Sequence, residues 1–204
     1  NMHMAASAIT LRDMRLASYH PGVANVSPIL YATGVVKTGR AEVLSYIIGF
    51  DPAEPLGGPR AAIAGTTKVK RDEAIIDGAV ARGHRLRLGD KVEILGKTFT
   101  IVGITEGLTN IVNSIAFIRL EDFQELRGGE AVSYALLKVK PGYDPADVAA
   151  AIAARNGKVS VLTRSEFARQ ERQIIKDMSA EVLNIMNLSG LLIGLAVTAL
   201  TLYT

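Results

Sequence analysis

The chain has 204 residues, which is enough for one large domain or two small ones. Hydrophobic residues make up 49% and aromatic residues only 5%, with no Trp, so Ala, Val, Ile and Leu must fill the core. The absence of Cys excludes disulfides, thiolate catalysis and cysteine-ligated metals. The histidines His3, His20 and His84 are isolated from one another, which argues against a zinc site.

The net charge of +3 is small and the basic residues are scattered along the chain. A nucleic-acid surface would need a basic stripe, and the one dense group consists of Arg82, His84, Arg85 and Arg87. Charge runs usually form a solvated edge, which is the interpretation we favour. Contact of this group with anionic lipid headgroups is the alternative.

The N-terminal quarter is predicted to contain a helix and two strands. Residues 1–4, "NMHM", resemble a cloning remnant and are left out of the fold. The run "ITLRDMRLASYH" at 9–20 suits a helix that the following proline ends. The runs at 25–36 and 41–52 are typical of strands, and Pro and Gly predict a surface loop over 51–59.

The middle of the chain is predicted to be rich in strands. A short strand over 74–76 precedes a helical turn capped by Asp77, and a strand followed by a short helix occupies 114–126.

The stretch "LGKTFT" at 95–100 contains the Gly-Lys-Thr that ends a nucleotide-binding P-loop. A P-loop needs a second glycine five residues before Gly96, and Lys91 occupies that position. Apolar and polar residues alternate on both sides of Gly96, which is the pattern of paired strands. We therefore predict a hairpin with its turn at Gly96, and no cofactor in this chain.

A strand–helix–strand unit is predicted to follow. The run "YALLKVK" at 134–140 is the first strand, and Asp144 and Pro145 begin an Ala-rich helix that Gly157 ends. The run "KVSVL" at 158–162 would be the returning strand. Such a crossover implies parallel pairing in a sheet that carries the helix on one face.

The last 20 residues, 185–204, contain no charged side chain. As a helix they would be about 30 Å long, the thickness of the bilayer hydrocarbon, so we predict a transmembrane segment. A buried core helix is the alternative. Gly190 and Gly194 form a G-x-x-x-G step, which would let another membrane helix approach closely. Because the sequence stops as the span is completed, we expect a fragment of a longer membrane protein.

A long helix is predicted to lead into this span. Thr163 and Glu166 have capping-box spacing, and no Gly or Pro interrupts residues 165–189. We expect a stalk over 164–184 that runs from an extramembrane domain into the bilayer as a rigid mechanical link. Packing of its amphipathic half on its own domain is compatible with this interpretation.

The sequence lacks the motifs of common hydrolases and metalloenzymes. It has no G-x-S-x-G, no H-E-x-x-H and no acidic metal cluster. The pairs Asp72–Glu73 and Glu121–Asp122 fall at predicted element ends, where acidic residues serve as caps. We therefore expect a mixed α/β domain tethered to a membrane-crossing helix, and neither an enzyme nor a metal protein.

Several motifs in a fixed order resemble a known family. They are "HPGVANVSPIL" (20–30), "YIIGFDP" (46–52), "AIIDGAVARGHRLRLGDKVEILGKTFTIVGI" (74–104), "AFIRLEDFQEL" (116–126) and "LLKVKPGYDPADVAAAI" (136–152). Together with the terminal helix they resemble the extracytoplasmic, MacB-like periplasmic core domain of ABC transporter permeases in the FtsX/MacB/LolC superfamily. The "GFDP" segment is most similar to the DevC branch.

The resemblance implies an α+β fold, in which a mixed α/β porter-like subdomain carries an inserted β-rich subdomain and is followed by the long helix. The porter-like part would comprise 24–72 and 134–163, and the β-rich insert 73–133. Residues 1–23 would hold the tag remnant and an N-terminal helix that follows a first membrane helix. Residues up to about 184 would lie on the periplasmic side of the cell inner membrane.

The resemblance also implies partners. The permease would work as a homo- or heterodimer in contact with membrane lipid, and separate ABC ATPase subunits or a fused ATPase domain would use the ATP. Some relatives also work with an adaptor of the membrane-fusion type. Its role would be mechanotransmission, in which ATP-driven motion reaches this domain during export or extraction of a substrate. The alternative is an FtsX-like regulatory protein that activates a partner such as a cell-wall hydrolase. A membrane-anchored enzyme is a third hypothesis.

The family has no single binding motif, so the candidate surface comes from the residues themselves. The loop "EGLTNIVNSI" at 106–115 lies between two predicted strands and contains Leu108, Ile111 and Val112. Apolar residues in an exposed loop favour a partner or substrate surface. The alternative is that they tuck under the β-rich part.

Overall fold

The computed structural model describes residues 9–39, 41–106, 114–157 and 159–169. The chain divides into two compact units, Asn1–Val159 and Ser160–Thr204. In the second unit the described residues are 160–169, of which 164–169 are helical.

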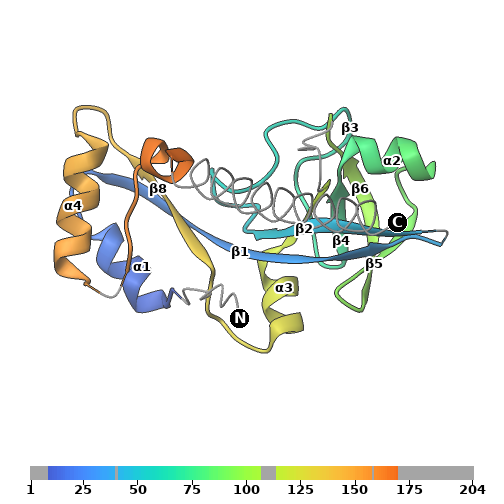
Figure 1. Ribbon diagram of the computed structural model, residues 1–204, viewed down its shortest axis with the longest axis horizontal. Helices are drawn as coiled ribbons and strands as arrows, with labels where there is room; N and C mark the ends of the chain where they lie inside the picture. The colour runs from blue at the N-terminus through green and yellow to red at the C-terminus, as the bar shows by residue number, and fades with distance from the viewer. Residues whose placement is uncertain (1–8, 40, 107–113, 158, 170–204) are drawn as a thin grey trace, which may run out of the picture. The chain divides into compact units, whose positions relative to one another are not determined.

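The first unit contains the named helices and strands (Figure 1). In chain order they are α1 (Leu11–Ser18), β1 (Val23–Lys37), β2 (Glu42–Phe50), β3 (Ala64–Gly65), β4 (Glu73–Ile76), α2 (Gly78–His84), β5 (Lys91–Ile94), β6 (Lys97–Ile104), β7 (Ser114–Arg119), α3 (Leu120–Arg127), β8 (Tyr134–Val139) and α4 (Pro145–Arg155). The predicted mixed α/β fold is confirmed.

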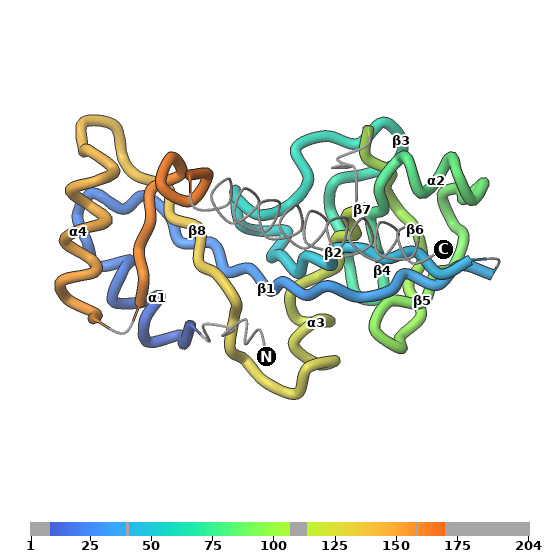
Figure 2. Tube along the Cα trace, in the orientation of Figure 1, coloured from blue at the N-terminus to red at the C-terminus, as the bar shows by residue number. Residues whose placement is uncertain are grey.

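Strands β1, β2, β7, β4, β6 and β5 form a closed ring (Figure 2). β1 pairs with β2 over Ile29–Lys37, and Val36 and Lys37 at its end also pair with β5. The ring continues from β2 through β7, β4 and β6 to β5. Because β1 has a hydrogen-bonded neighbour on each edge at Val36, the sheet closes on itself as a small barrel.

The main core fills this barrel. Alternate residues of β6 point inward, so Phe99 and Ile101 are fully buried while Thr98 is exposed. The core continues into α3, where fully buried Phe123 packs against Gly49 of β2. A Cβ at Gly49 would lie 2.7 Å from Phe123 Cδ1, so only glycine lets α3 approach the barrel this closely.

A second apolar cluster lies on the opposite face of the same strands and comprises Ile29, Phe50, Val69, Ile75 and Phe117. The predicted surface loop over 51–59 lies against it, because side chains at Gly57 and Gly58 would collide with Ile29 and Phe50. Glu54 fastens this loop by accepting a 2.7 Å hydrogen bond from Asn25 Nδ2 of β1.

The N-terminal half of β1 extends beyond the ring and pairs with β8, and α1 and α4 lie beside this two-stranded ribbon (Figure 1). Thr10 and Asp13 form a capping box at the start of α1, and Asp144 caps α4 with Pro145 at its first turn. Asn156 Nδ2 at the end of α4 donates to Asp13 Oδ1 of α1 at 2.7 Å, which joins the two helices.

The predicted returning strand at 158–162 is wrong for the residues described there, 159–162, which form no strand. β8 pairs antiparallel with β1 instead of entering a parallel crossover. α4 ends at Arg155, before Gly157, and the N–H of Val159 donates to the carbonyl of Asn156 in a tight turn. A short apolar run in the sequence does not show whether a neighbouring strand has a free edge for it to pair with. Here β2 already occupies the second edge of β1 from Ile29 onward.

The predicted hairpin at Gly96 is confirmed. Ile94 of β5 pairs with Lys97 of β6 across a two-residue turn, in which Leu95 and Gly96 both have positive φ (52° and 83°). This is the type I′ geometry that matches the twist of paired strands. Similarly, Thr163 and Glu166 form the predicted capping box, because Thr163 N–H donates to Glu166 Oε2 at 2.7 Å.

The predicted division into a porter-like part and a β-rich insert stays a prediction, as do the predicted stalk and membrane span. The described sheet runs through both the predicted porter-like segments and the insert 73–133, since β2 pairs with β7. Within the described residues no helix has the length and apolarity needed to cross a membrane. The predicted stalk beyond residue 169 and the predicted span 185–204, with Gly190 and Gly194, lie outside the described residues.

Candidate partner-binding surface at the α2 end of the barrel

Helix α2 is held tightly against the end of β6. Asp77, which is fully buried, caps the helix by accepting a hydrogen bond from Ala79 N–H at 2.7 Å. Gly78 follows, and a Cβ there would clash with the carbonyl oxygen of Thr105. The sequence Asp-Gly therefore supplies both the cap and the space that this contact requires.

The predicted apolar loop leaves the barrel beside α2. At its start Thr105 is 1% exposed and donates its N–H to the carbonyl of Ile76 at 3.0 Å. At its end the hydroxyl of Ser114 lies 2.5 Å from that of Ser45 on β2. Both ends of the loop are thus fixed in the barrel wall. Leu108, Ile111 and Val112 themselves lie outside the described residues, so their role stays a prediction.

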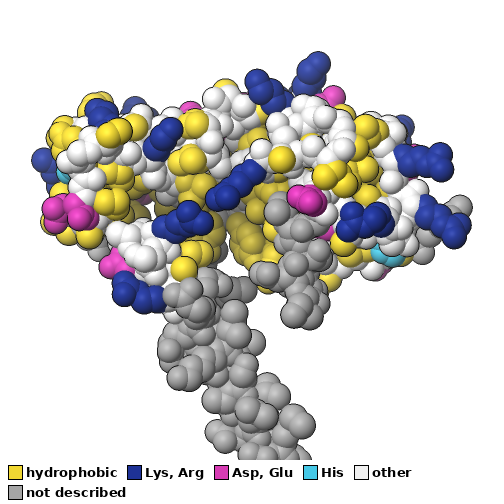
Figure 3. Space-filling view, turned by 90° about the horizontal axis from the view of Figure 1, so that it is seen from above, with side chains coloured by type: hydrophobic (Ala, Val, Ile, Leu, Met, Phe, Trp, Pro, Cys, Tyr) yellow, Lys and Arg dark blue, Asp and Glu magenta, His cyan; other side chains and the backbone are white. Residues whose placement is uncertain are grey.

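The basic group predicted from the sequence lies at the other end of α2. Arg82, Arg85 and Arg87 are exposed, as a solvated edge requires, and His84 is half-buried. Arg85 adopts the left-handed conformation that ends the helix, with φ 56°. Lys and Arg side chains are spread over the face shown in Figure 3.

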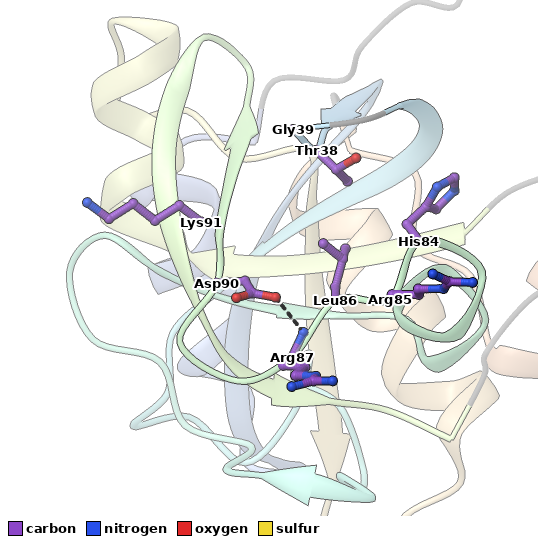
Figure 4. Close-up of a pocket in the computed structure, with 8 residues that line it drawn as sticks. All are labelled: Thr38, Gly39, His84, Arg85, Leu86, Arg87, Asp90 and Lys91. Atoms are coloured by element: carbon purple, nitrogen blue, oxygen red, sulfur yellow. Dashed lines mark hydrogen bonds between the residues drawn. The ribbon is translucent and has the colours of Figure 1, made fainter.

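A shallow concavity of about 570 Å³ adjoins this group (Figure 4). It is lined by Thr38, Gly39, His84, Arg85, Leu86, Arg87, Asp90 and Lys91. The side chains of Arg85, Arg87 and Lys91 point in different directions in Figure 4. A phosphate site needs donors that converge on one point, so this arrangement fits a contact surface better than a small-anion site.

Lys97, the lysine of the Gly-Lys-Thr stretch, is occupied by carboxylates. Its Nζ lies 2.5 Å from Asp72 Oδ1 and 3.2 Å from Asp122 Oδ1. The hydrogen bond with Asp72 is the main cause that raises the pKa of Lys97, and the same bond lowers the pKa of Asp72. Lys97 therefore joins the hairpin to α3 and serves the fold.

Asp122 has a different role from the helix cap expected at this position. Its carboxylate is fully buried, and it accepts hydrogen bonds from Asp72 N–H at 3.2 Å and from Lys97 Nζ. Arg119 Nε lies 3.5 Å from Asp122 Oδ2, which is an ionic contact too long for a good hydrogen bond. Asp122 is thus the centre of an ion cluster that ties α3 to the barrel.

A partly buried aromatic surface on the outside of β1, β2 and β8 was missed by the sequence analysis. The ring of Tyr31 lies 5.4 Å from that of Tyr46 and 6.4 Å from that of Tyr134, which is 47% exposed. Burial is the main cause that raises the pKa of Tyr31. Only the register that places Ile29 opposite Tyr134 brings these residues together, and no local motif encodes it.

Metal binding has no support in the part of the chain that the structure describes. No group of three or more His, Asp or Glu residues there could hold a metal ion.

Comparison with known proteins gives a consistent family. The sequence profile of the MacB-like periplasmic core domain matches residues 3–155. No curated protein sequence matches the chain.

Solved structures share the fold at low sequence identity. The extracellular domain of the noncanonic ABC-type transporter YknZ from Gram-positive bacteria has a TM-score of 0.59 and 14% identity, over 76% of this chain and 88% of that one. The periplasmic region of MacB from Actinobacillus actinomycetemcomitans has a TM-score of 0.59 and 12% identity, over 82% and 84%. A domain of a putative permease from Porphyromonas gingivalis has a TM-score of 0.53 and 16% identity, over 74% and 78%.

Proposed function

Because this chain belongs to the family of MacB-like periplasmic core domains, we propose that it is the extracytoplasmic part of an ABC transporter permease. It couples the ATP-driven motion of partner ATPase subunits to the export or extraction of a substrate across or from the membrane. The observation that carries this proposal is the family match over residues 3–155.

A domain that relays movement has to be stiff, and the first unit has the features of a stiff body. Its strands close into a ring, so each of them has a hydrogen-bonded neighbour on both edges. The buried carboxylate of Asp122 fixes α3, and the Asn156–Asp13 bond fixes α4 to α1. These contacts support a rigid relay more than a hinged clamp.

The proposal places ATP on separate ATPase subunits and no cofactor in this chain. Lys97 supports this, because its ammonium group already binds two carboxylates. The permease works as a homo- or heterodimer in the cell inner membrane, anchored by 185–204, with this domain on the extracytoplasmic side. A membrane-fusion-type adaptor is a further proposed partner.

The alternative function is FtsX-like regulation, in which the domain activates an extracytoplasmic partner such as a cell-wall hydrolase. Two features of the described surface favour this alternative. Its concavity is shallow, and in the Tyr31–Tyr46–Tyr134 surface the exposed ring of Tyr134 offers an aromatic contact to a protein partner. Finding an adaptor as the physical partner favours export, whereas finding a hydrolase favours regulation.

The coupling role is tested by changing the stiffness of the predicted stalk. Two glycines inserted after Met178 cost about 1 kcal/mol each in a helix interior and loosen the link. We expect the altered permease to retain ATP hydrolysis with its ATPase. We also expect that it will not restore function in a strain that lacks the permease.

Two matched insertions serve as controls. Two alanines at the same place rotate and lengthen the helix while keeping it stiff, which separates stiffness from register. Two glycines between Gly128 and Gly129, in the exposed turn after α3, should leave function intact. If the variant with two glycines after Met178 restores function fully, the stalk only anchors the domain, and the coupling role is wrong.

A further inference from the structure

Helix α1 presents one face to the first unit and leaves the other without a partner in the described residues. Ala17 is buried, and Met14 packs against the main core. On the outer side, Leu11 is 48% exposed, Leu16 38% and Tyr19 at the C-cap 74%. Three large apolar side chains on so short a helix are unusual for a face that only contacts water.

The outer face also carries the positive charge of the helix. At about 100° per residue, Leu11, Arg15, Tyr19, Arg12 and Leu16 follow one another in this order around an arc of about 140°. Arg12 and Arg15 are exposed and form no ion pair within the described residues. The stripe therefore alternates apolar and basic side chains.

The one acidic residue of α1 is turned away from this stripe. Asp13 Oδ2 accepts hydrogen bonds from the N–H and the hydroxyl of Thr10 at 2.9 and 2.7 Å, and Oδ1 accepts from Asn156. These bonds, those from Thr10 first, lower the pKa of Asp13, so it stays charged while engaged in the capping box. The outer face is thus left with positive charge only.

We propose that this face of α1 docks on the surface of an anionic lipid bilayer, with Leu11, Leu16 and Tyr19 entering the headgroup region and Arg12 and Arg15 binding lipid phosphates. Basic residues beside large apolar ones, with a tyrosine at the end, are the composition of helices that lie in a membrane interface. Two arginines complement a negatively charged leaflet. The inference rests on the proposed function, because the bilayer it names is that of the proposed permease.

The test uses the whole chain, whose lack of cysteine permits a single probe. Leu16→Cys labelled with the environment-sensitive fluorophore NBD is reconstituted into vesicles of phosphatidylcholine and phosphatidylglycerol, and into phosphatidylcholine alone. Ile63→Cys, an apolar position 58% exposed elsewhere on the domain, is the matched control. Tyr19→Cys is the second probe in case the Leu16 variant folds poorly, as judged by circular dichroism.

In the anionic vesicles we expect the emission at residue 16 to shift to the blue and to be quenched by spin-labelled lipids, while the emission at residue 63 is not. Both effects should be lost in high salt and in the Arg12→Glu/Arg15→Glu variant, and kept in Arg85→Glu/Arg87→Glu. An equal response in neutral vesicles would overturn the electrostatic part of the proposal. A blue shift without lipid quenching would assign the face to a protein or a second copy instead.

Failure of the anchor and failure of the docking are distinguishable. Flotation of the vesicles at high pH reports whether the chain is integrated through 185–204. If the chain is integrated and the probe at residue 16 still emits as in water, α1 does not dock and the inference is overturned. If the chain is not integrated at all, the membrane part of the proposed function is what fails.

Discussion

At the scale of single residues, the buried carboxylate of Asp122 contributes most clearly to stability. It binds Lys97 and the N–H of Asp72, and it contacts Arg119. Asp122→Ala would leave these donors unpaired in a partly buried place, so we expect a loss of about 3 kcal/mol in the free energy of unfolding. Urea denaturation measures this loss.

Glu121 is the matched control for this substitution. It occupies the neighbouring position in the first turn of α3, but its side chain is 64% exposed. We expect Glu121→Ala to change the free energy of unfolding by no more than about 0.5 kcal/mol. Equal effects of the two substitutions would show that the ion cluster does not hold α3 in place.

The Asp72–Lys97 pair should make stability depend on pH at both extremes. The pKa of Asp72 is lowered from 3.8, so its contribution is present above that value and is lost as the pH falls through the lower folded-state pKa. The pKa of Lys97 is raised from 10.5, so its contribution is present below that value and is lost as the pH rises through the higher folded-state pKa. Between these limits the pair is intact.

We therefore expect Asp72→Asn to be less stable than the wild type at neutral pH, with the difference disappearing in strong acid. Urea denaturation at several pH values measures it, and the exposed Asp147 supplies the control variant Asp147→Asn. A difference that stays constant down to the lowest pH would mean that the ion pair is not its cause.

At the scale of elements, the β5–β6 hairpin depends on the backbone freedom of its turn. Gly96 has φ 83°, a conformation that disfavours side chains. Gly96→Ala should lower the free energy of unfolding by about 1 kcal/mol. Gly129, which has open space around it and no positive φ, gives a control in which Gly129→Ala costs nothing. Thermal melting of both variants compares them, and an unchanged melting temperature for Gly96→Ala would contradict the assigned turn.

The loop at 107–113 carries the other prediction at this scale. Its ends are fixed by Thr105 and Ser114, so changes at its apolar residues need not disturb the barrel. We expect Leu108→Asp and Val112→Asp to abolish function in the strain lacking the permease while leaving the melting temperature of the domain unchanged. A drop in melting temperature would show instead that these residues tuck under the barrel as core.

Local signals in the sequence predicted most elements, and long-range pairing is what they could not predict. Asp77 and Asp144 cap their helices as expected, and the alternation around Gly96 identified the hairpin. The closure of the barrel depends on β1 pairing with β5, about 57 residues further along, and residue periodicity carries no information on such partners. The returning strand at 158–162 failed for the same reason.

The candidate surface was predictable to a lesser degree. The charge run at 82–87 was visible in the sequence, and the structure adds only that its side chains diverge. The Tyr31–Tyr46–Tyr134 surface and the outer face of α1 needed the register of the strands and the burial of each residue. Asp122 looked like an ordinary helix cap until its burial beside Lys97 was known.

At the scale of the whole molecule, the proposed function requires a rigid extracytoplasmic body that moves when the ATPase partner binds ATP. A domain that is merely attached to the membrane would not respond to nucleotide. The cysteine-free sequence allows a direct test with one spin label per copy at Thr98→Cys, an exposed position on β6.

The deciding measurement is the distance between the two labels in the permease pair, obtained by double electron–electron resonance in lipid nanodiscs with the ATPase bound. We expect the distance distribution to differ between the nucleotide-free complex and the complex trapped with ATP and vanadate. If the barrel moves as one body, a label at Lys91→Cys should report the same movement. Identical distributions in both states, in a complex whose ATPase demonstrably holds the nucleotide, would contradict the account.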